Sequence, residues 1–329
     1  MRDCLHILNG DCAREVLEAT GLPGEMVVWA DVLHDGPVPG GLEDDALLRV
    51  RAGPLMGADA RAAQAFVASM RAANARMARH AEFEEVIFWL EHDLFDQLLL
   101  LRHLAWVSRL ADASRFRLIC IDSFPGHPRF AGLGELSPTE MASLWPGRVP
   151  VTAEHVALGR RLWDTFVAPE PRMFADLVLR GDTRELPFAA GALTRFLEDY
   201  PAVGSGLSRS ERQILGVVRD GYRDPTAAFR AAAAREERVF MGDLTFFRIV
   251  DGMTAGRAPL LSFTGERDAR VPRSGELTLT GAGHAVLDGR ADHIDLNGID
   301  RWMGGVHLTD GRYRWTGTDV ATDLDELRP

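Results

Sequence analysis

The sequence of 329 residues contains no lysine, so all 37 of its basic residues are arginine. This absence excludes a lysine Schiff base and a Walker-type phosphate loop, because both need a lysine amine. An anion bound by this chain is therefore expected to be held by arginine, by backbone N–H groups or by a metal ion. The glycine fingerprint G-x-G-x-x-G is also absent, which disfavours an enzyme that uses NAD.

Cysteine and long apolar segments are scarce as well. The three cysteines, Cys4, Cys12 and Cys120, lack C-x-x-C spacing, and we expect reduced thiols rather than a disulfide or a zinc site. No apolar signal segment stands at the N-terminus, and apolar runs such as the one at 98–101 are far too short to span a bilayer. These observations predict a cytoplasmic protein with no membrane partner.

The composition is that of a globular protein, with 46% hydrophobic and 26% charged residues. A chain of this length favours two or three domains. The formal net charge of −11 argues against a surface that coats nucleic acid, although it leaves room for a local basic face.

The first 130 residues alternate short apolar runs with helical patterns. Strands are expected at 4–9, 26–30, 86–90 and 116–121, helices at 13–20 and 59–82, and a connecting loop at 36–57. Nearly continuous apolar strands separated by helices indicate a parallel sheet that is covered on both faces. We therefore predict an α/β fold with a Rossmann-like, mostly parallel sheet in a ligand-binding domain at 1–135.

Helical signals dominate the next segment. A capping box at Ser137 and Glu140 starts one helix, and three more helices are expected at 153–167, 170–179 and 188–199. We predict a helical connecting region at 136–204.

The C-terminal part has the element order of a winged helix. Helices are expected at 208–219, 225–237 and 243–253, with Asp243 as the N-cap of the third, followed by strands at 259–263 and 276–279. The loop between the two strands carries Arg267, Arg270 and Arg273, and the stretch 277–289 resembles the second wing strand and closing helix of winged-helix regulators. We predict a winged-helix-like α+β domain at 205–329 that ends in a tryptophan-rich tail.

Polar and acidic residues follow all four N-terminal strands. In an open α/β sheet, ligands bind outside the carboxyl ends of the strands, so these residues are the candidates for a site. They are Asn9, Gly10 and Asp11 after the first strand, Asp31 and His34 after the second, Glu91, His92, Asp93, Asp96 and Gln97 after the third, and Asp122 after the fourth.

Carboxylates and imidazoles that converge on one sheet edge suit two kinds of chemistry. They are ligands for a divalent metal ion, and they serve as general acids and bases when crowding separates their pKa values. We assign catalytic roles to His92 as acid–base, to Glu91 as its orienting group, and to Asp93 and His34. The other residues are assigned to ligand binding, with Asp11 and Asp31 contacting a metal or ligand hydroxyl groups. The spacing matches no metal motif, so the metal is unknown.

Each of these residues also has an ordinary structural interpretation. Asp11 would cap a helix that starts at Cys12. Asp93 would cap the helix that follows the third strand, and Asp96 would be an acidic residue in the first turn of that helix. His34 would lie in a simple turn. Arg129 and Arg148 flank a glycine-rich loop and would hold a phosphate or carboxylate together, unless they are surface arginines. The sequence leaves both interpretations open.

Several segments resemble the bacterial domain-of-unknown-function 1835 family. They are LHILNGD at 5–11, WADVLHDGPVP at 29–39, FWLEHDLFDQLLLL at 88–101, GLGELSP at 132–138 and RVPVT at 148–152. The resemblance implies an intracellular α/β protein with an attached helical and C-terminal part. It implies no activity, cofactor or catalytic residue.

The first functional hypothesis is therefore an enzyme, or a former enzyme, that binds a small phosphorylated or nucleotide-like ligand. The alternative is a ligand-sensing regulator that binds DNA or a protein through the winged-helix-like part. The predicted helix at 243–253 has one arginine, two acids and two phenylalanines, which counts against base recognition. A third hypothesis is an interaction module whose tail at 301–315 packs back on the body or forms a dimer edge.

Overall fold

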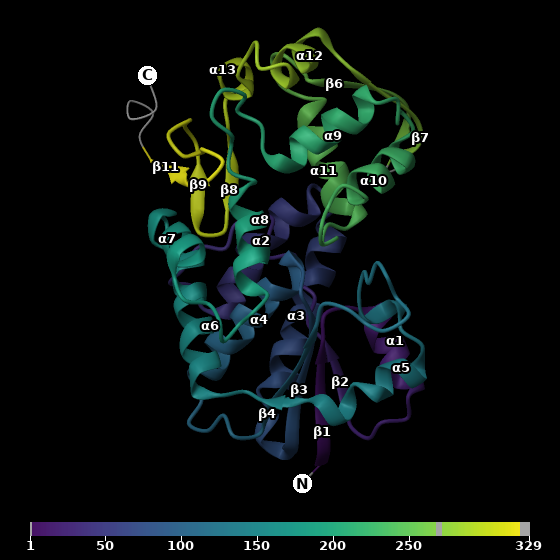
Figure 1. Cartoon of the computed structure of the whole chain (residues 1–329), viewed down its shortest axis with the longest axis vertical. Coiled ribbons are helices and arrows are strands. Elements are labelled where there is room, and N and C mark those ends of the chain that lie inside the picture. Colours follow the sequence, from purple (N-terminus) through teal and green to yellow (C-terminus); the bar gives the residue numbers. More distant parts are fainter. Residues whose placement is uncertain (1, 268–271, 323–329) are drawn as a thin grey trace. The chain divides into compact units, whose positions relative to one another are not determined.

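The computed structural model describes residues 2–267 and 272–322 (Figure 1). The chain divides into two compact units. Unit 1 comprises residues 1–193 and Gly304–Val306, and unit 2 comprises residues 194–303 and 307–329. Of the region predicted as a helical connection, residues 136–193 lie in unit 1 and residues 194–204 lie in unit 2.

Unit 1 is built on a five-stranded sheet with the order β2-β1-β3-β4-β5. Its strands are β1 (Arg2–Leu8), β2 (Glu25–Val28), β3 (Phe83–Glu91), β4 (Phe116–Ile121) and β5 (Val149–Pro150). The first four are parallel, and the short β5 pairs antiparallel with β4. The apolar run at 86–90 is at most 1% exposed at every residue, as a strand covered on both faces requires. The predicted α/β fold with a mostly parallel sheet is confirmed.

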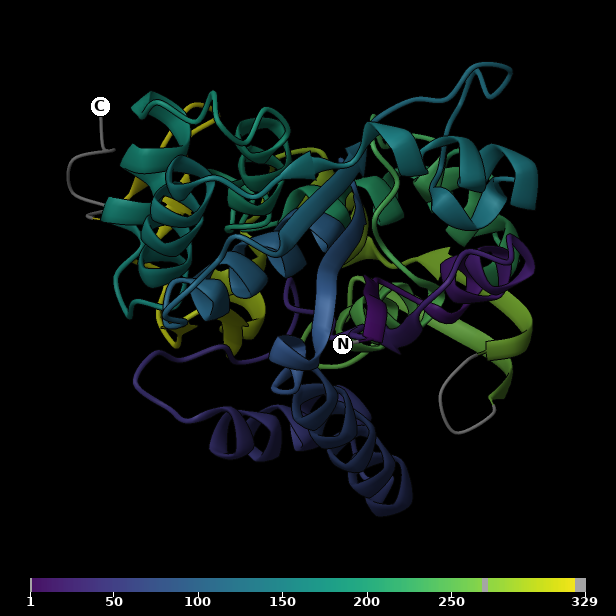
Figure 2. The ribbon, with the colours of Figure 1, turned by 90° about the horizontal axis from the view of Figure 1, so that it is seen from below.

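Helices cover the two faces of this sheet (Figures 1 and 2). One face carries α1 (Asp11–Ala19), the 3₁₀ turn η2 (Leu133–Glu135) and α5 (Pro138–Ser143), which enclose a core around Trp89 and Leu133. The other face carries α3 (Ala60–Met77), α4 (Leu94–Val107) and α6 (Ala153–Phe166). The capping box predicted at Ser137 and Glu140 is present at the start of α5.

The strand order creates a switch point between β1 and β3. After β1 the chain moves outward to β2, and it then crosses back to place β3 on the other side of β1. The connections that leave β1 and β3 therefore diverge. In open α/β sheets, ligands bind beside the carboxyl ends of the two strands at such a switch point. Asn9 and Glu91 lie at these two strand ends.

Two predictions about unit 1 need correction. The segment predicted as a loop at 36–57 contains α2 (Asp44–Met56), which buries Arg51 and has Pro54 in its last turn. The single helix predicted at 59–82 ends at Met77, and a 3₁₀ turn, η1 (His80–Glu82), leads into β3. There the His80 ring packs against the ring of Trp106, which ties the turn to α4. The chain continues through η3 (Trp145–Gly147) and, after α6, α7 (Arg172–Arg180).

Unit 2 has the element order of a winged helix. Between α8 (Ala189–Leu197), which begins in unit 1, and the tail lie α9 (Arg209–Arg219), α10 (Pro225–Ala233), α11 (Asp243–Met253), the antiparallel strands β6 (Leu261–Arg267) and β7 (Pro272–Leu279), α12 (Gly281–Leu287) and α13 (His293–Asn297). Residues of α9, α10, α11 and both strands share one core that includes Phe246 and Leu277. Asp243 is the first residue of α11 rather than its cap, because Gly242 holds the N-cap position. Arg270 and the side chains of Arg267 and Arg273 lie outside the described residues.

The tryptophan-rich tail forms short strands. They are β8 (Arg301–Met303), β9 (Val306–Leu308), β10 (Arg314–Trp315) and β11 (Val320–Ala321). Trp315 is 9% exposed and its backbone pairs with that of Pro201 and Val203, all within unit 2. The contacts of this segment favour packing back over a free dimer edge.

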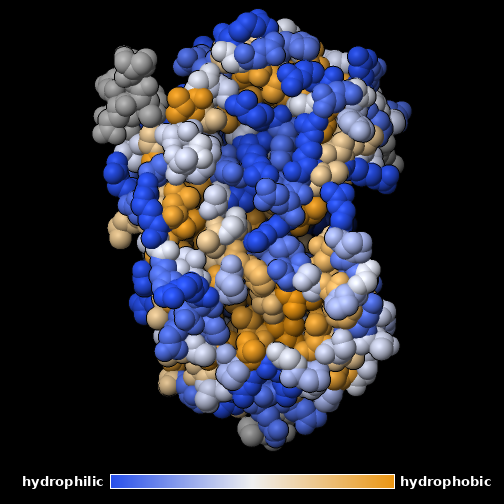
Figure 3. Space-filling model, in the orientation of Figure 1, coloured by the Kyte–Doolittle hydropathy of each residue, from blue (hydrophilic) through white to orange (hydrophobic). Residues whose placement is uncertain are grey.

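On the face of the molecule in Figure 3, apolar residues gather over the middle of unit 1, and hydrophilic residues surround them. The exposed large apolar side chains belong to both units, with Met173 in unit 1 and Leu244 in unit 2 among them. Scattered apolar residues of this kind are usual on protein surfaces. In the described ranges, the helices lack the length and apolar character that crossing a membrane requires.

Candidate functional site

The turn from β3 into α4 brings three carboxylates together. Asp93 is the N-cap of α4, and its side chain accepts a hydrogen bond of 3.0 Å from the backbone N–H of Asp96, as the sequence predicted. Asp96 turns back toward the strand, and its Oδ1 accepts a hydrogen bond of 3.0 Å from the backbone N–H of Glu91. Candidate ligand atoms of Glu91, Asp93 and Asp96 all lie within 4.8 Å of one another.

Two neighbouring segments complete this acidic cluster. Asn9, which follows β1, donates through Nδ2 to Glu91 Oε1 and to both carboxylate oxygens of Asp96, each at 3.0 Å. The backbone N–H of Leu133, in η2, donates to Glu91 Oε1 at 2.7 Å. Segments separated by more than 80 residues therefore converge on these carboxylates at the switch point of the sheet.

The acidic cluster is buried. Glu91 and Asp93 are 5% exposed and Asp96 is 1% exposed. Burial raises the pKa of Asp96 well above its usual value, and the nearby carboxylates of Asp93 and Glu91 raise it further. Burial also raises the pKa of Glu91, although the Leu133 N–H and the Asn9 amide act against this. Within the described ranges, neither Glu91 nor Asp96 forms an ion pair with arginine.

Buried carboxylates this close together need a positive charge between them. Protons supply it when the pKa values rise, and a divalent cation supplies it when one binds. Carboxylate and amide oxygens are the ligands that magnesium, manganese and calcium ions prefer. The three carboxylates fit such a cation by donor type, whereas the Asn9 amide faces them through its N–H groups.

A glycine lets the η2 loop approach Glu91. Gly132 has a φ of 144°, and a Cβ atom added to it would lie 2.5 Å from Glu91 Oε2. Leu133, the next residue, is fully buried. The sequence showed a glycine-rich segment here but gave no sign that its backbone covers the carboxylate of Glu91.

Gln97 supports the backbone of the site. Its Nε2 donates to the carbonyl oxygen of Glu91 at 2.7 Å and lies 3.4 Å from Cys120 Sγ. Burial raises the pKa of the Cys120 thiol, and the nearby carboxylate of Asp96 adds to this. Gln97 therefore fixes the junction between β3 and α4, and Cys120 is a half-buried thiol beside it.

Asp31 lies in a different environment from the acidic cluster. It forms a two-pronged ion pair with Arg51, whose Nε and Nη2 donate to the Asp31 carboxylate at 2.7 and 2.6 Å, and both side chains are almost fully buried. Arg51 also donates to three backbone carbonyls in the 32–37 segment. These contacts assign Asp31 to the packing of α2 rather than to the acidic cluster.

The two candidate histidines lie beside aromatic rings. The His92 ring stacks on Phe130 with centroids 6.4 Å apart and meets the edge of Phe188 at 6.1 Å. The His34 ring meets Phe95, in the first turn of α4, at 6.2 Å. Both rings are half-buried, and His92 directly follows Glu91.

Of the residues that follow β1, Asp11 lies at the surface, whereas Asn9 contacts the acidic cluster. Asp11 is the first residue of α1 rather than its cap, and its exposed carboxylate accepts a hydrogen bond of 3.1 Å from Arg14. Gly10 is the N-cap and has an extended backbone, so it adjoins Asn9 at the positive end of α1.

The remaining candidates do not join the acidic cluster. Asp122 and Arg129 are exposed, and Asp122 accepts a hydrogen bond from Ser123. Arg148 donates to Glu85 at 2.9 Å. Glu85 lies six residues before Glu91 along β3, which corresponds to about 20 Å. Arg148 therefore pairs with a residue far from the acidic cluster, and the anion clamp of Arg129 and Arg148 stays a prediction.

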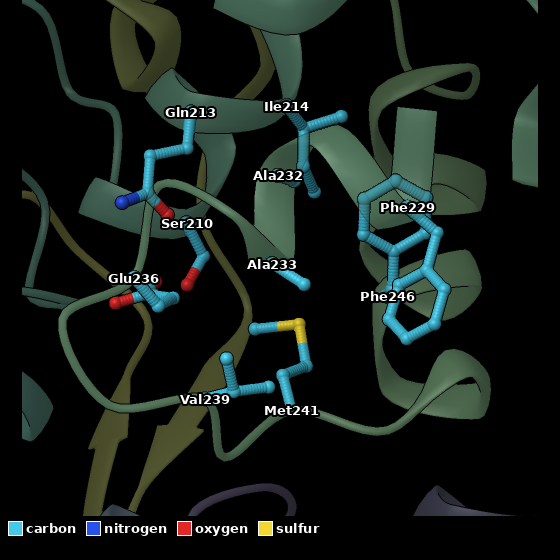
Figure 4. A pocket seen from close by; sticks show the side chains of 10 residues that line it. All are labelled: Ser210, Gln213, Ile214, Phe229, Ala232, Ala233, Glu236, Val239, Met241 and Phe246. Carbon is cyan, nitrogen blue, oxygen red and sulfur yellow. The ribbon is translucent and has the colours of Figure 1, made fainter. Parts of the chain in front are cut away.

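Unit 2 contains a separate, mostly apolar pocket of about 320 Å³, part of it open to solvent (Figure 4). It lies among α9, α10, α11 and the 239–241 segment, and its lining includes Phe229, Met241 and Phe246. Ser210, Gln213 and Glu236 supply its polar groups, and Glu236 forms an ion pair of 2.7 Å with Arg195.

Comparison with known proteins adds little to this description. No family model and no curated protein matches the chain. A solved structure of the Aeropyrum pernix ORC1 protein in complex with DNA shares 11% sequence identity over 88% of this chain and 77% of that chain, with a TM-score of 0.22. So low a score carries no argument about fold or function. The resemblance to the domain-of-unknown-function 1835 family therefore stays a prediction.

Proposed function

We propose that unit 1 binds a divalent cation at Glu91, Asp93 and Asp96 and, through it, a small phosphorylated or nucleotide-like ligand. The observation that carries this proposal is the buried cluster of three carboxylates at the switch point between β1 and β3. Ligands of open α/β sheets bind at such switch points. A bound cation would offset the repulsion that raises the pKa values of Glu91 and Asp96.

The surroundings of the acidic cluster suit a phosphate-bearing ligand. The Asn9 amide already contacts two of the carboxylates, and Gly10 begins α1 immediately after it. Backbone N–H groups at the start of a helix attract anions, so a phosphate bridged to the cation would gain a second contact there. If the protein catalyses a reaction, His92 is the acid–base candidate, since it directly follows Glu91 in the chain.

The test is a cation titration of the full-length protein after treatment with a chelator. Isothermal titration calorimetry with Mn²⁺ should show one saturable site per chain, and Asp96→Asn and Glu91→Gln should abolish it. Asp122→Asn is the matched control, because it removes an exposed carboxylate near the end of the neighbouring strand and should leave binding unchanged. An absence of Mn²⁺ and Mg²⁺ binding in the natural protein, or equal loss in the control, would refute the cation site.

The ligand class has its own measurement. Adenosine diphosphate should bind more tightly with Mn²⁺ than with a chelator, and the Asp96→Asn variant should lose this difference. Equal affinity under both conditions would show that the cation site does not hold the ligand.

A second candidate function belongs to unit 2. Its winged-helix-like order and its mostly apolar pocket suit a ligand-sensing regulator that binds DNA or a protein. A mobility-shift assay with random duplex DNA at low salt tests the DNA part, because phosphate contacts give non-specific affinity to any DNA-binding surface. An absence of a shift would leave protein binding as the role of this unit.

A further inference from the structure

A second polar cleft lies in unit 1 at the other end of α4. It encloses about 780 Å³, part of it open to solvent, between the 39–42 loop, the start of α2, the end of α4 and α6. The acidic cluster lies at the first turn of α4, and Val107 ends this helix about 16 Å further along its axis. The two sites are therefore separate.

Arginines give this cleft a positive lining. Arg102, Arg109 and Arg160 line it together with two acids, Asp44 and Asp164, so the formal charge of its lining is +1. The chain as a whole carries −11, which makes a positive cleft a local exception. Because the sequence has no lysine, arginine is the only basic side chain that offers fixed charge to an anion.

Arg102 is held in place before any ligand arrives. It is 6% exposed, its Nη2 donates to Asp44 at 2.9 Å, and its guanidinium lies 4.7 Å from the ring centre of Trp29. Its Nε and Nη1 groups make no hydrogen bond within the described ranges. A buried and oriented guanidinium with unused donors is suited to bind a carboxylate or phosphate.

The other two arginines are free to adjust. Arg109 is exposed and its side chain has no ion-pair partner within the ranges that the structure describes. Arg160 contacts Asp164 at 3.4 Å, and both of these side chains are more than half exposed, so this pair is weak. Each guanidinium can therefore turn toward an anion in the cleft with little loss.

An apolar wall lies next to these charges. Leu47, Ala105, Trp163 and Val167 line the same cleft. Trp163 is half-buried and packs against Phe166, with ring centroids 5.6 Å apart, which fixes the indole as a flat surface. A ligand that fills this cleft would place its charged end near the arginines and a planar apolar body against the indole.

We propose that this cleft is a binding site for a small organic oxyanion, in which a carboxylate or phosphate group is attached to a planar apolar body. Arg102 orients the oxyanion, Arg109 and Arg160 close on it from the rim, and Trp163 contacts the apolar body. This site works without a metal ion and is independent of the acidic cluster.

The test uses phenyl phosphate, benzoate and inorganic phosphate as probes of the full-length protein. Isothermal titration calorimetry is done with a chelator and at physiological ionic strength, so that cation-mediated binding is excluded. Phenyl phosphate and benzoate should bind saturably, and phenyl phosphate more tightly than inorganic phosphate. The Asp96→Asn variant should bind phenyl phosphate as the natural protein does, which separates this site from the proposed cation site.

Variants on α6 provide a matched pair. Arg160→Gln should weaken phenyl phosphate binding about tenfold, the size expected for one charge-assisted hydrogen bond. Arg161→Gln removes an adjacent exposed arginine that does not line the cleft and should leave the affinity unchanged. Arg109→Gln should act like Arg160→Gln, and thermal melts verify that all three variants fold.

Three results would overturn the proposal. They are the absence of saturable binding of both organic probes, equal weakening by Arg160→Gln and Arg161→Gln, and equal affinity for phenyl phosphate and inorganic phosphate.

Discussion

Asp96 shows how a single side chain links stability to a proposed function. Its carboxyl group is 1% exposed and contacts Asn9 and the backbone of Glu91. Because burial and neighbouring carboxylates raise its pKa, the folded state keeps a proton that the unfolded chain releases near pH 4. The favourable contribution of this proton is therefore complete at low pH and is lost as the pH rises through the folded-state pKa.

This loss of stability with rising pH leads to a prediction for the metal-free protein. Asp96→Asn should raise the melting temperature at pH 8 and reduce its fall between pH 5 and pH 8, because the amide keeps an acceptor for the N–H of Glu91 and adds no charge. Mn²⁺ should stabilise the natural protein at pH 8 and leave the variant unchanged. A calorimetric melt at each pH measures both effects. Lower stability of the variant at pH 8 would contradict the proposed repulsion.

The ion pair between Asp31 and Arg51 predicts a different kind of effect. Removing one partner of a buried ion pair leaves an uncompensated charge, so Arg51→Met should lower the free energy of unfolding by about 3–5 kcal/mol. Arg49, two residues earlier in α2, has a side chain that is 67% exposed. Arg49→Met should therefore change the free energy of unfolding by less than about 1 kcal/mol. Urea unfolding measures both variants. A similar small change in each would show that the buried pair contributes little.

Single residues also show what sequence patterns can predict. The cap at Asp93 follows from its position between an apolar run and a leucine-rich helix, and the structure confirms it. The roles of Asp31 and Asp96 are not visible in this way, because both are acids that follow a strand. Asp31 faces a buried arginine 20 residues away and Asp96 faces Asn9 at a distance of 87 residues.

At the level of elements, the η2 loop covers the acidic cluster. Gly132→Ala should weaken Mn²⁺ binding, because the added methyl group would lie 2.5 Å from Glu91 Oε2 and the residue needs a φ of 144°. Gly147→Ala is the matched control in the next loop, since a Cβ atom there meets no atom within 4 Å. Calorimetric titration measures both variants, and equal affinity would show that the loop does not shape the cluster.

Secondary structure was predictable where one local signal dominates. The strand predicted at 116–121 has the observed bounds, and the helix predicted at 208–219 is α9, which begins with a capping box at Ser208 and Glu211. The α2 helix escaped prediction because glycines and prolines surround it, and its main anchor, Arg51, binds a distant strand end. Local patterns report turns and caps, whereas such anchors depend on the tertiary fold.

At the scale of the whole molecule, the chain returns to unit 1 near its end. The backbone of Gly304 and Gly305 pairs with Val38 and Phe166 at 2.8 and 3.0 Å. Sequence patterns did not predict this return, because the glycine pair resembles an ordinary turn between strands. The expected boundary at 135 was likewise based on a change of pattern, and the packing of α5 and α6 on earlier helices lies across it.

The backbone contacts of the 304–306 segment predict that Gly305 is sensitive to substitution, although it lies far from the sheet in sequence. Gly305→Ala should destabilise unit 1, because the added methyl group would collide with the carbonyl of Val167. Hydrogen exchange should show faster exchange at the amides of Val38 and Gly40, which pair with Gly304 and Val167. Gly281→Ala, at an open position in α12, is the control and should leave these amides protected. Unchanged exchange in Gly305→Ala would mean that this contact contributes little to unit 1.

The return of the chain at 304–306 also affects the order of events during synthesis. Domains usually fold as units, and an N-terminal domain folds while the ribosome is still making the rest. Unit 1 holds the first 193 residues, yet its last three residues emerge only after more than 100 residues of unit 2 have been made. The N-terminal unit therefore remains incomplete until residue 306 has been made, and its final backbone contacts form only after most of unit 2 has been synthesised.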